Sequence, residues 1–77
     1  MDDKSVFNIQ EKIAVLKTYP TGWTKELNLV SWNGNTVKYD IRDWDPDHKY
    51  MSGGITLYKG EMQRLMKAMQ KRIQKQD

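Results

Sequence analysis

The 77-residue sequence predicts an α+β fold in which four strands precede one C-terminal helix. Three observations predict this fold. Aliphatic and aromatic residues gather in short segments before residue 58, turn-forming residues separate those segments, and methionine and aliphatic residues recur at helical spacing after residue 61. No linker, repeat or low-complexity segment divides the chain, so we expect one domain over residues 1–77.

The first strand is expected over residues 7–17, FNIQEKIAVLK. Its two apolar stretches are separated by a polar break at residues 10–12, which predicts a bend or a β-bulge there. Pro20 and Gly22 then mark a turn.

Two further strands are expected over residues 23–32, WTKELNLVSW, and residues 36–44, TVKYDIRDW. Asn33-Gly34 lies between them, and this dipeptide is a strong signal of a β-hairpin. A polar loop beginning at Asp45-Pro46-Asp47 leads to a short fourth strand over residues 55–57.

The helix is predicted from a single apolar stripe with spacings of three, one, three and four residues: Met62, Leu65, Met66, Met69 and Ile73. A helix of about 15 residues is marginal alone, so its stripe must be buried. Tyr58-Lys59-Gly60 offers no good N-cap side chain, so we expect the first turn to fray.

The size of the chain favours a homodimer through these helix residues. A domain this short buries only about 60% of the surface that its unfolded chain exposes. The sequence contains no cysteine, which excludes disulfides and cysteine-based zinc sites as sources of stability. Pairing with a second copy would bury more apolar surface.

The distribution of charge bounds the function. Of the net charge of +3, the last 19 residues carry +4, so the overall basicity says little about where a ligand binds. No segment is long and apolar enough to span a membrane, and the acidic N-terminus does not resemble a signal peptide, so we expect a cytoplasmic protein.

No combination of residues predicts an enzyme. The sequence lacks a P-loop, paired carboxylates with an evident pocket, and scaffold for Ser/His/Asp chemistry. The one histidine, His48, lies in a short loop that cannot close a metal coordination shell, and we expect it to be solvated. We therefore expect neither a metal nor a cofactor.

Alternation in the third strand provides the candidate binding face. Val37, Tyr39 and Ile41 point one way and are expected in the core. The opposite face combines cations with a large aromatic: Thr36, Lys38, Asp40, Arg42 and Trp44. Aromatic rings that stack on bases, with cations for phosphates, are what binding of single-stranded nucleic acid requires. Alternatively, Trp44 plugs the edge of the core and the charges form a solvated ladder.

The second strand is ambiguous because both of its faces are partly apolar. Trp32 fits the core better than a ligand platform. Trp23 and Lys25 lie beside the turn at residues 20–22, and we expect them to be accessible.

The run Tyr39-Asp40-Ile41-Arg42-Asp43-Trp44, the acidic Pro-containing loop, Gly54-Ile55-Thr56-Leu57 and the amphipathic helix resemble the positive cofactor four family of transcriptional coactivators. The segments Lys25–Asn28, Val30–Asn33 and Pro46–His48 resemble its bacterial YdbC-type branch. The resemblance extends from about Val6 to Ile73.

This resemblance implies a curved, four-stranded antiparallel sheet followed by one helix (ββββα), in a homodimer whose helices pair. It also implies binding of single-stranded DNA with little base preference, in support of transcription, replication or repair. Arg42, Trp44 and Lys25 match the family's binding positions, whereas Lys38, Trp23 and Lys49 are weaker assignments. The transcription machinery is a further candidate partner, and the bacterial nucleoid a candidate location, although the extended regulatory tail of the eukaryotic coactivators is missing.

Three alternatives remain open. The basic helix could read duplex DNA, or the protein could bind RNA. The exposed face of the sheet could instead dock a protein partner without nucleic acid, since Trp and Arg are also frequent in protein interfaces.

Overall fold

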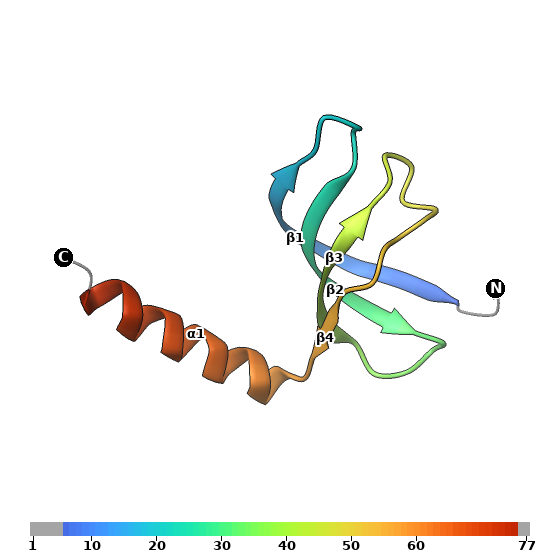
Figure 1. Ribbon diagram of the computed structural model, residues 1–77. Helices are drawn as coiled ribbons and strands as arrows, with labels where there is room; N and C mark the ends of the chain where they lie inside the picture. Colours follow the sequence, from blue (N-terminus) through green and yellow to red (C-terminus); the bar gives the residue numbers. More distant parts are fainter. Residues whose placement is uncertain (1–5, 76–77) are drawn as a thin grey trace.

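The computed structural model describes residues 6–75 and confirms the predicted ββββα architecture (Figure 1). The strands pair antiparallel throughout, in the spatial order β1-β2-β3-β4. The elements are β1 (Phe7–Thr18), β2 (Thr24–Trp32), β3 (Lys38–Trp44), β4 (Ile55–Leu57) and α1 (Lys59–Lys75).

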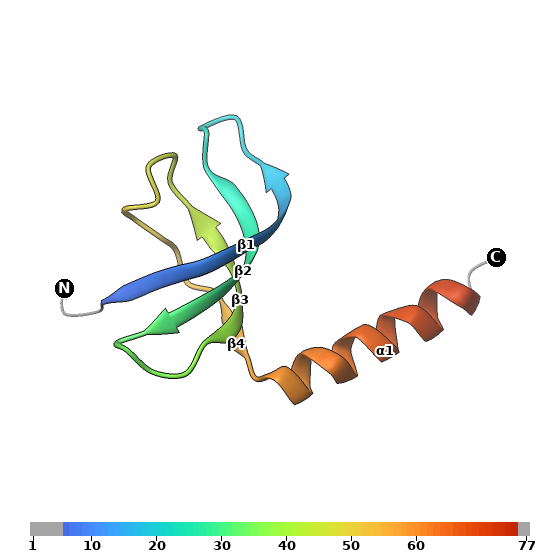
Figure 2. The same ribbon diagram turned by 180° about the vertical axis from the view of Figure 1, so that it is seen from behind.

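Bulges bend β1 along β2. The pairing register shifts between Ile9 and Glu11, which confirms the irregularity predicted from the polar break, and it shifts twice more further along the strand. Each bulge adds an unpaired residue and increases the local twist. The long first strand therefore curves around its partner instead of lying flat (Figures 1 and 2).

The Asn33-Gly34 dipeptide forms the expected turn between β2 and β3. Both residues have positive φ, 53° and 76°, and the Asn35 N–H donates to the Trp32 carbonyl at 2.9 Å. Positive φ at two successive positions is what favours Asn-Gly in such turns. The connection is longer than predicted, because β3 begins at Lys38 and not at residue 36.

Gly54 allows β4 to approach β3. A Cβ atom at this position would overlap the Cβ of Arg42 and the carbonyl oxygen of Ile41. Only a residue without a side chain fits against the neighbouring backbone here.

The helix begins at Lys59 and has a cap that the sequence reasoning missed. The Tyr58 N–H donates to Glu61 Oε1 at 2.8 Å. This is one of the two hydrogen bonds of a capping box, the one in which the side chain at the third helical position accepts from the backbone N–H of the N-cap residue. Beyond its first turn α1 extends away from the sheet (Figure 2). Met62 is its one buried residue, whereas Leu65, Met66, Met69 and Ile73 are exposed in the described chain.

The core lies on the opposite face of β3 from the one predicted. Residues paired directly across two strands share a face, so Asn28 lies with Asp40 and Glu26 with Arg42. We call this the inner face, and its residues on β2 and β3 are Thr24, Glu26, Asn28, Val30, Trp32, Lys38, Asp40, Arg42 and Trp44. The other side, the outer face, carries Lys25, Leu27, Leu29, Tyr39, Ile41 and Asp43.

The expectation that Val37, Tyr39 and Ile41 form the core is therefore wrong. Val37 is exposed and the other two are only half-buried, whereas Asp40 and Trp44 are fully buried. The physical reason is the connection between β3 and β4, residues 45–54, which folds back over the inner face and hydrogen-bonds to it. Alternation along one strand does not reveal which face a distant loop covers.

Candidate nucleic-acid interface

Trp44 is sealed inside the protein. Its exposed fraction is 0%, its ring centroid lies 5.1 Å from that of Phe7, and the His48 ring stacks on it at 5.6 Å. The prediction that Trp44 offers an open stacking platform is thus wrong, and the alternative, a plug at the edge of the core, describes its position. Because the chain folds back after the end of β3, an indole expected at an exposed strand end becomes an anchor for the loop.

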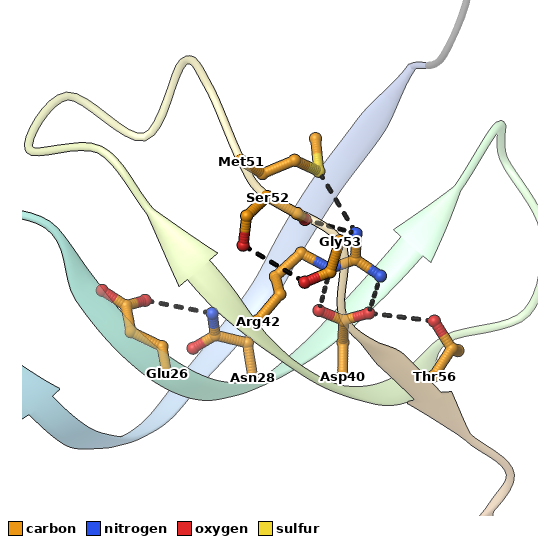
Figure 3. A network of polar contacts seen from close by, with 8 residues as sticks. All are labelled: Glu26, Asn28, Asp40, Arg42, Met51, Ser52, Gly53 and Thr56. Carbon is orange, nitrogen blue, oxygen red and sulfur yellow. Dashed lines mark hydrogen bonds and ion pairs between the residues drawn. The ribbon is translucent and has the colours of Figure 1, made fainter.

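The guanidinium group of Arg42 likewise binds other groups of the protein (Figure 3). Its Nε and Nη2 donate to the two carboxylate oxygens of Asp40 at 2.7 and 2.9 Å, and its Nη1 donates to the Ser52 carbonyl at 3.2 Å. The guanidinium also lies 4.8 Å from the Trp32 ring, and only 14% of the side chain is exposed. The bidentate pair leaves Arg42 poorly placed to neutralise a phosphate, contrary to the prediction.

The Asp40 carboxylate explains why an anion sits among the cations of β3. It accepts from Arg42 on both oxygens and from the Thr56 hydroxyl at 2.9 Å, and it is fully buried (Figure 3). A buried charge of this kind needs such partners. Asp40 and Arg42 therefore join β3 to β4 and to residues 51–52 instead of facing solvent.

A second polar cluster joins β2 to the loop at His48. Glu26 accepts from the Thr24 hydroxyl at 2.6 Å and from Asn28 Nδ2 at 3.1 Å, and its Oε2 lies 2.8 Å from His48 Nε2. Burial alone would raise the pKa of Glu26, but the hydrogen bonds from Thr24, Asn28 and His48 outweigh it and lower that pKa. His48 is half-buried and paired, not solvated as expected.

Asp45 closes the loop. Its Oδ1 accepts from the backbone N–H groups of Tyr50 and Lys49 at 2.6 and 2.7 Å, and its Oδ2 from that of Asp47 at 3.3 Å. The backbone hydrogen bond from Tyr50 is the largest cause that lowers the pKa of Asp45. Asp45 and His48 together hold residues 45–50 in one conformation over the inner face.

Accessible aromatic and basic groups instead meet in a hollow of about 550 Å³ between the start of β3 and the start of α1, which we call the Lys38 hollow. Lys38 Nζ lies 4.8 Å from the centroid of the Tyr58 ring, and Tyr58 is 62% exposed. The residues that line it are Asn35, Thr36, Val37, Lys38, Tyr58 and Lys59. The sequence reasoning missed Tyr58, although an aromatic between a strand and a basic helix was visible in the sequence.

A smaller hollow of about 320 Å³, which we call the Trp23 hollow, lies where β3 ends beside the β1–β2 turn. It is lined by Tyr19, Thr21, Trp23, Asp43 and Ser52. The Tyr19 hydroxyl donates to Asp43 Oδ1 at 3.1 Å, and Lys25 Nζ lies 3.7 Å from the same oxygen. The hydrogen bond with Tyr19, and then the charge of Asp43, raise the pKa of Lys25 above its ordinary value.

The register separates the predicted site residues. Lys25 pairs with Asp43 and therefore lies on the outer face with the Trp23 hollow, whereas Lys38 belongs to the inner face at the other end of β3. Lys49 is exposed in the loop and lines neither hollow. The continuous strip of Trp and cations expected on one face of β3 is thus replaced by two separate hollows.

Among residues 6–75, no group of three or more His, Cys, Asp or Glu side chains is arranged to hold a metal ion. Across that same part of the chain, α1 is the one helix, and it is neither long nor apolar enough to cross a membrane.

Comparison with known proteins gives a family match. The family described as Transcriptional Coactivator p15 (PC4) matches residues 19–68, which include β2, β3, β4 and both hollows. A protein of Treponema pallidum, itself uncharacterised, is 39% identical over 62 residues, which cover 80% of this chain and 73% of that protein. The assignment to the YdbC-type branch stays a prediction. The chain therefore belongs to the PC4 family, a nucleic-acid-binding family without enzymatic activity.

Proposed function

We propose that this protein binds single-stranded DNA with little base preference, in support of transcription, replication or repair. Family membership supports a role of this kind. The observation that carries the proposal is that accessible aromatic rings and lysine ammonium groups occur together at two hollows. Lys38 lies over the Tyr58 ring in one, and in the other Trp23 lines the hollow while Lys25 lies beside its lining residue Asp43.

This arrangement suits an unpaired strand. The bases of a single strand can stack on aromatic rings, which contributes roughly 1–3 kcal/mol per base, while lysines neutralise the phosphates between them. In a duplex the base faces are stacked on each other and are inaccessible to Tyr58 or Trp23. The basic residues on α1 would contact duplex phosphates, but they offer no aromatic partner.

The test is a titration of labelled dT oligonucleotide and of the duplex of equal length, with the matching RNA as a third ligand. We expect clear preference for the single strand. A plot of the logarithm of the association constant against the logarithm of the salt concentration should have a slope of about −0.7 for each phosphate neutralised. Equal or tighter binding of the duplex would instead support contact through α1. Absence of binding to every oligonucleotide at low salt would favour a protein-interaction module.

We also propose that two copies pair through α1. After its first turn the helix leaves the sheet, so the apolar stripe Leu65, Met66, Met69 and Ile73 is uncovered within the described chain (Figure 1). An isolated 17-residue helix gains little stability in water unless such a stripe is buried. Sedimentation at micromolar concentration should give a dimer, and Met69→Glu should give a monomer; a wild-type monomer would contradict the proposal.

A further inference from the structure

We propose that the Trp23 hollow prefers guanine to the other bases, because Asp43 presents a carboxylate beside the indole. This inference rests on the proposed binding of single-stranded DNA and adds a base preference at one position. The hollow brings together two aromatic rings, from Tyr19 and Trp23, and one carboxylate, in a volume of about 320 Å³.

The Asp43 carboxylate is fixed from one side and free on the other. Its Oδ1 accepts from the Tyr19 hydroxyl at 3.1 Å and faces Lys25 Nζ at 3.7 Å. Its Oδ2 accepts no hydrogen bond from residues 6–75, although 27% of the side chain is exposed. An ionised carboxylate can accept about four hydrogen bonds, so Asp43 has unused acceptor positions at an accessible site.

The charge of Asp43 decides which part of a nucleotide fits. A phosphate is repelled by the carboxylate, whereas a base edge with hydrogen-bond donors is attracted, and the phosphate can be held by the neighbouring Lys25 instead. Lys25 carries a positive charge at neutral pH, and the hydrogen bond with Tyr19 and the charge of Asp43 raise its pKa further. The hollow thus offers an acceptor for the base, and Lys25 beside Asp43 offers a cation for the backbone.

Guanine matches this acceptor best among the four bases. Its N1–H and N2 amino group lie side by side and can both donate to one carboxylate. Adenine and cytosine each place a ring acceptor beside their amino group, and the N3–H of thymine lies between two carbonyl oxygens. Those acceptors would face the carboxylate and weaken the contact. A good bidentate contact discriminates between bases by about 1–3 kcal/mol.

The experiment measures the affinity of the full chain for three oligonucleotides: a dT tract, the same tract with one internal dG, and the same tract with deoxyinosine at that position. A single substitution allows the protein to choose the register that places the base in the hollow, and it avoids guanine quadruplexes. We expect the dG strand to bind about tenfold more tightly than the dT tract. Deoxyinosine keeps N1–H but lacks the amino group, so its affinity should be intermediate.

Asp43→Asn should abolish the preference for dG, because an amide can also donate to the carbonyl groups of thymine. Asp47→Asn is the matched control: it makes the same change in charge at an exposed loop position that lines neither hollow, and it should keep the preference. The oligonucleotide series on the wild-type chain tests the inference even if Asp43→Asn fails to fold.

Two results would overturn the inference, and they differ. Equal affinity of the wild-type chain for the three strands would remove the guanine preference but leave binding of single-stranded DNA intact. Failure of all three strands to bind would remove the proposed function and the preference together.

Discussion

Trp44 is the largest fully buried side chain in the described chain, and its indole connects three parts of the protein. Phe7 contacts it from the start of β1, and His48 stacks on it from the loop. His48 in turn reaches Glu26 on β2. A single residue at the end of β3 thus anchors the loop and one end of the sheet.

Replacing Trp44 by Ala should therefore unfold the protein or nearly so. Truncation of a buried aromatic costs about 3–5 kcal/mol, which is comparable to the whole stability of a small domain. Urea unfolding followed by circular dichroism measures the loss. Trp23→Ala, which truncates a half-buried indole, should stay folded under the same conditions. A Trp44→Ala protein as stable as the Trp23→Ala protein would show that the indole is not an anchor.

Single residues also mark where the sequence was informative and where it was not. The sequence shows Asp40 as an anion among cations. It does not reveal that Asp40 is buried, where it accepts two hydrogen bonds from the Arg42 guanidinium and one from the Thr56 hydroxyl. Those contacts depend on how β4 and residues 51–52 return to β3, and these segments are distant from Asp40 in the sequence. Tyr58 lies between β4 and α1. Neither strand alternation nor helical spacing predicts which way the side chain of such a residue points.

At the level of elements, local signals predicted most of the fold. The Asn-Gly turn, the polar break in β1 and the apolar stripe of α1 are local patterns, and the structure contains the feature that each predicts. Which face of the sheet is buried could not be predicted in this way. Both faces carry aliphatic residues, and the loop over residues 45–54 decides between them through Asp45 and His48.

That loop predicts loss of stability in acid. The folded-state pKa values of Glu26 and Asp45 are both lowered, so each carboxylate stabilises the fold fully above its unfolded pKa of about 4. This stabilisation is lost as the pH falls below about 4 through the lower folded-state values. The urea concentration at the unfolding midpoint should fall as the pH is lowered from 6 to 2. In Asp45→Asn this midpoint should depend less steeply on pH. An unchanged slope in Asp45→Asn would contradict the role of Asp45.

The whole molecule is a bent sheet with a helix that points away from it (Figures 1 and 2). The two hollows lie at opposite ends of β3, so a strand that occupies both must pass along or around the sheet. The projecting helix leaves the sheet accessible while it offers an apolar stripe to a second copy. In this account binding of DNA and dimerisation use different surfaces. Substitutions in the apolar stripe of α1 should therefore change the oligomeric state and leave the residues that line the two hollows in place.

The central claim is that the aromatic rings and lysines at the two hollows, and not Trp44 or Arg42, contact the single strand. Tyr58→Leu tests it most directly, with Tyr50→Leu as the matched control, because Tyr50 is also exposed but lines neither hollow. Affinity for a dT oligonucleotide should fall about tenfold in Tyr58→Leu, as expected for loss of one stacked base, and stay at the wild-type value in Tyr50→Leu. Wild-type affinity in a folded Tyr58→Leu protein would contradict the claim.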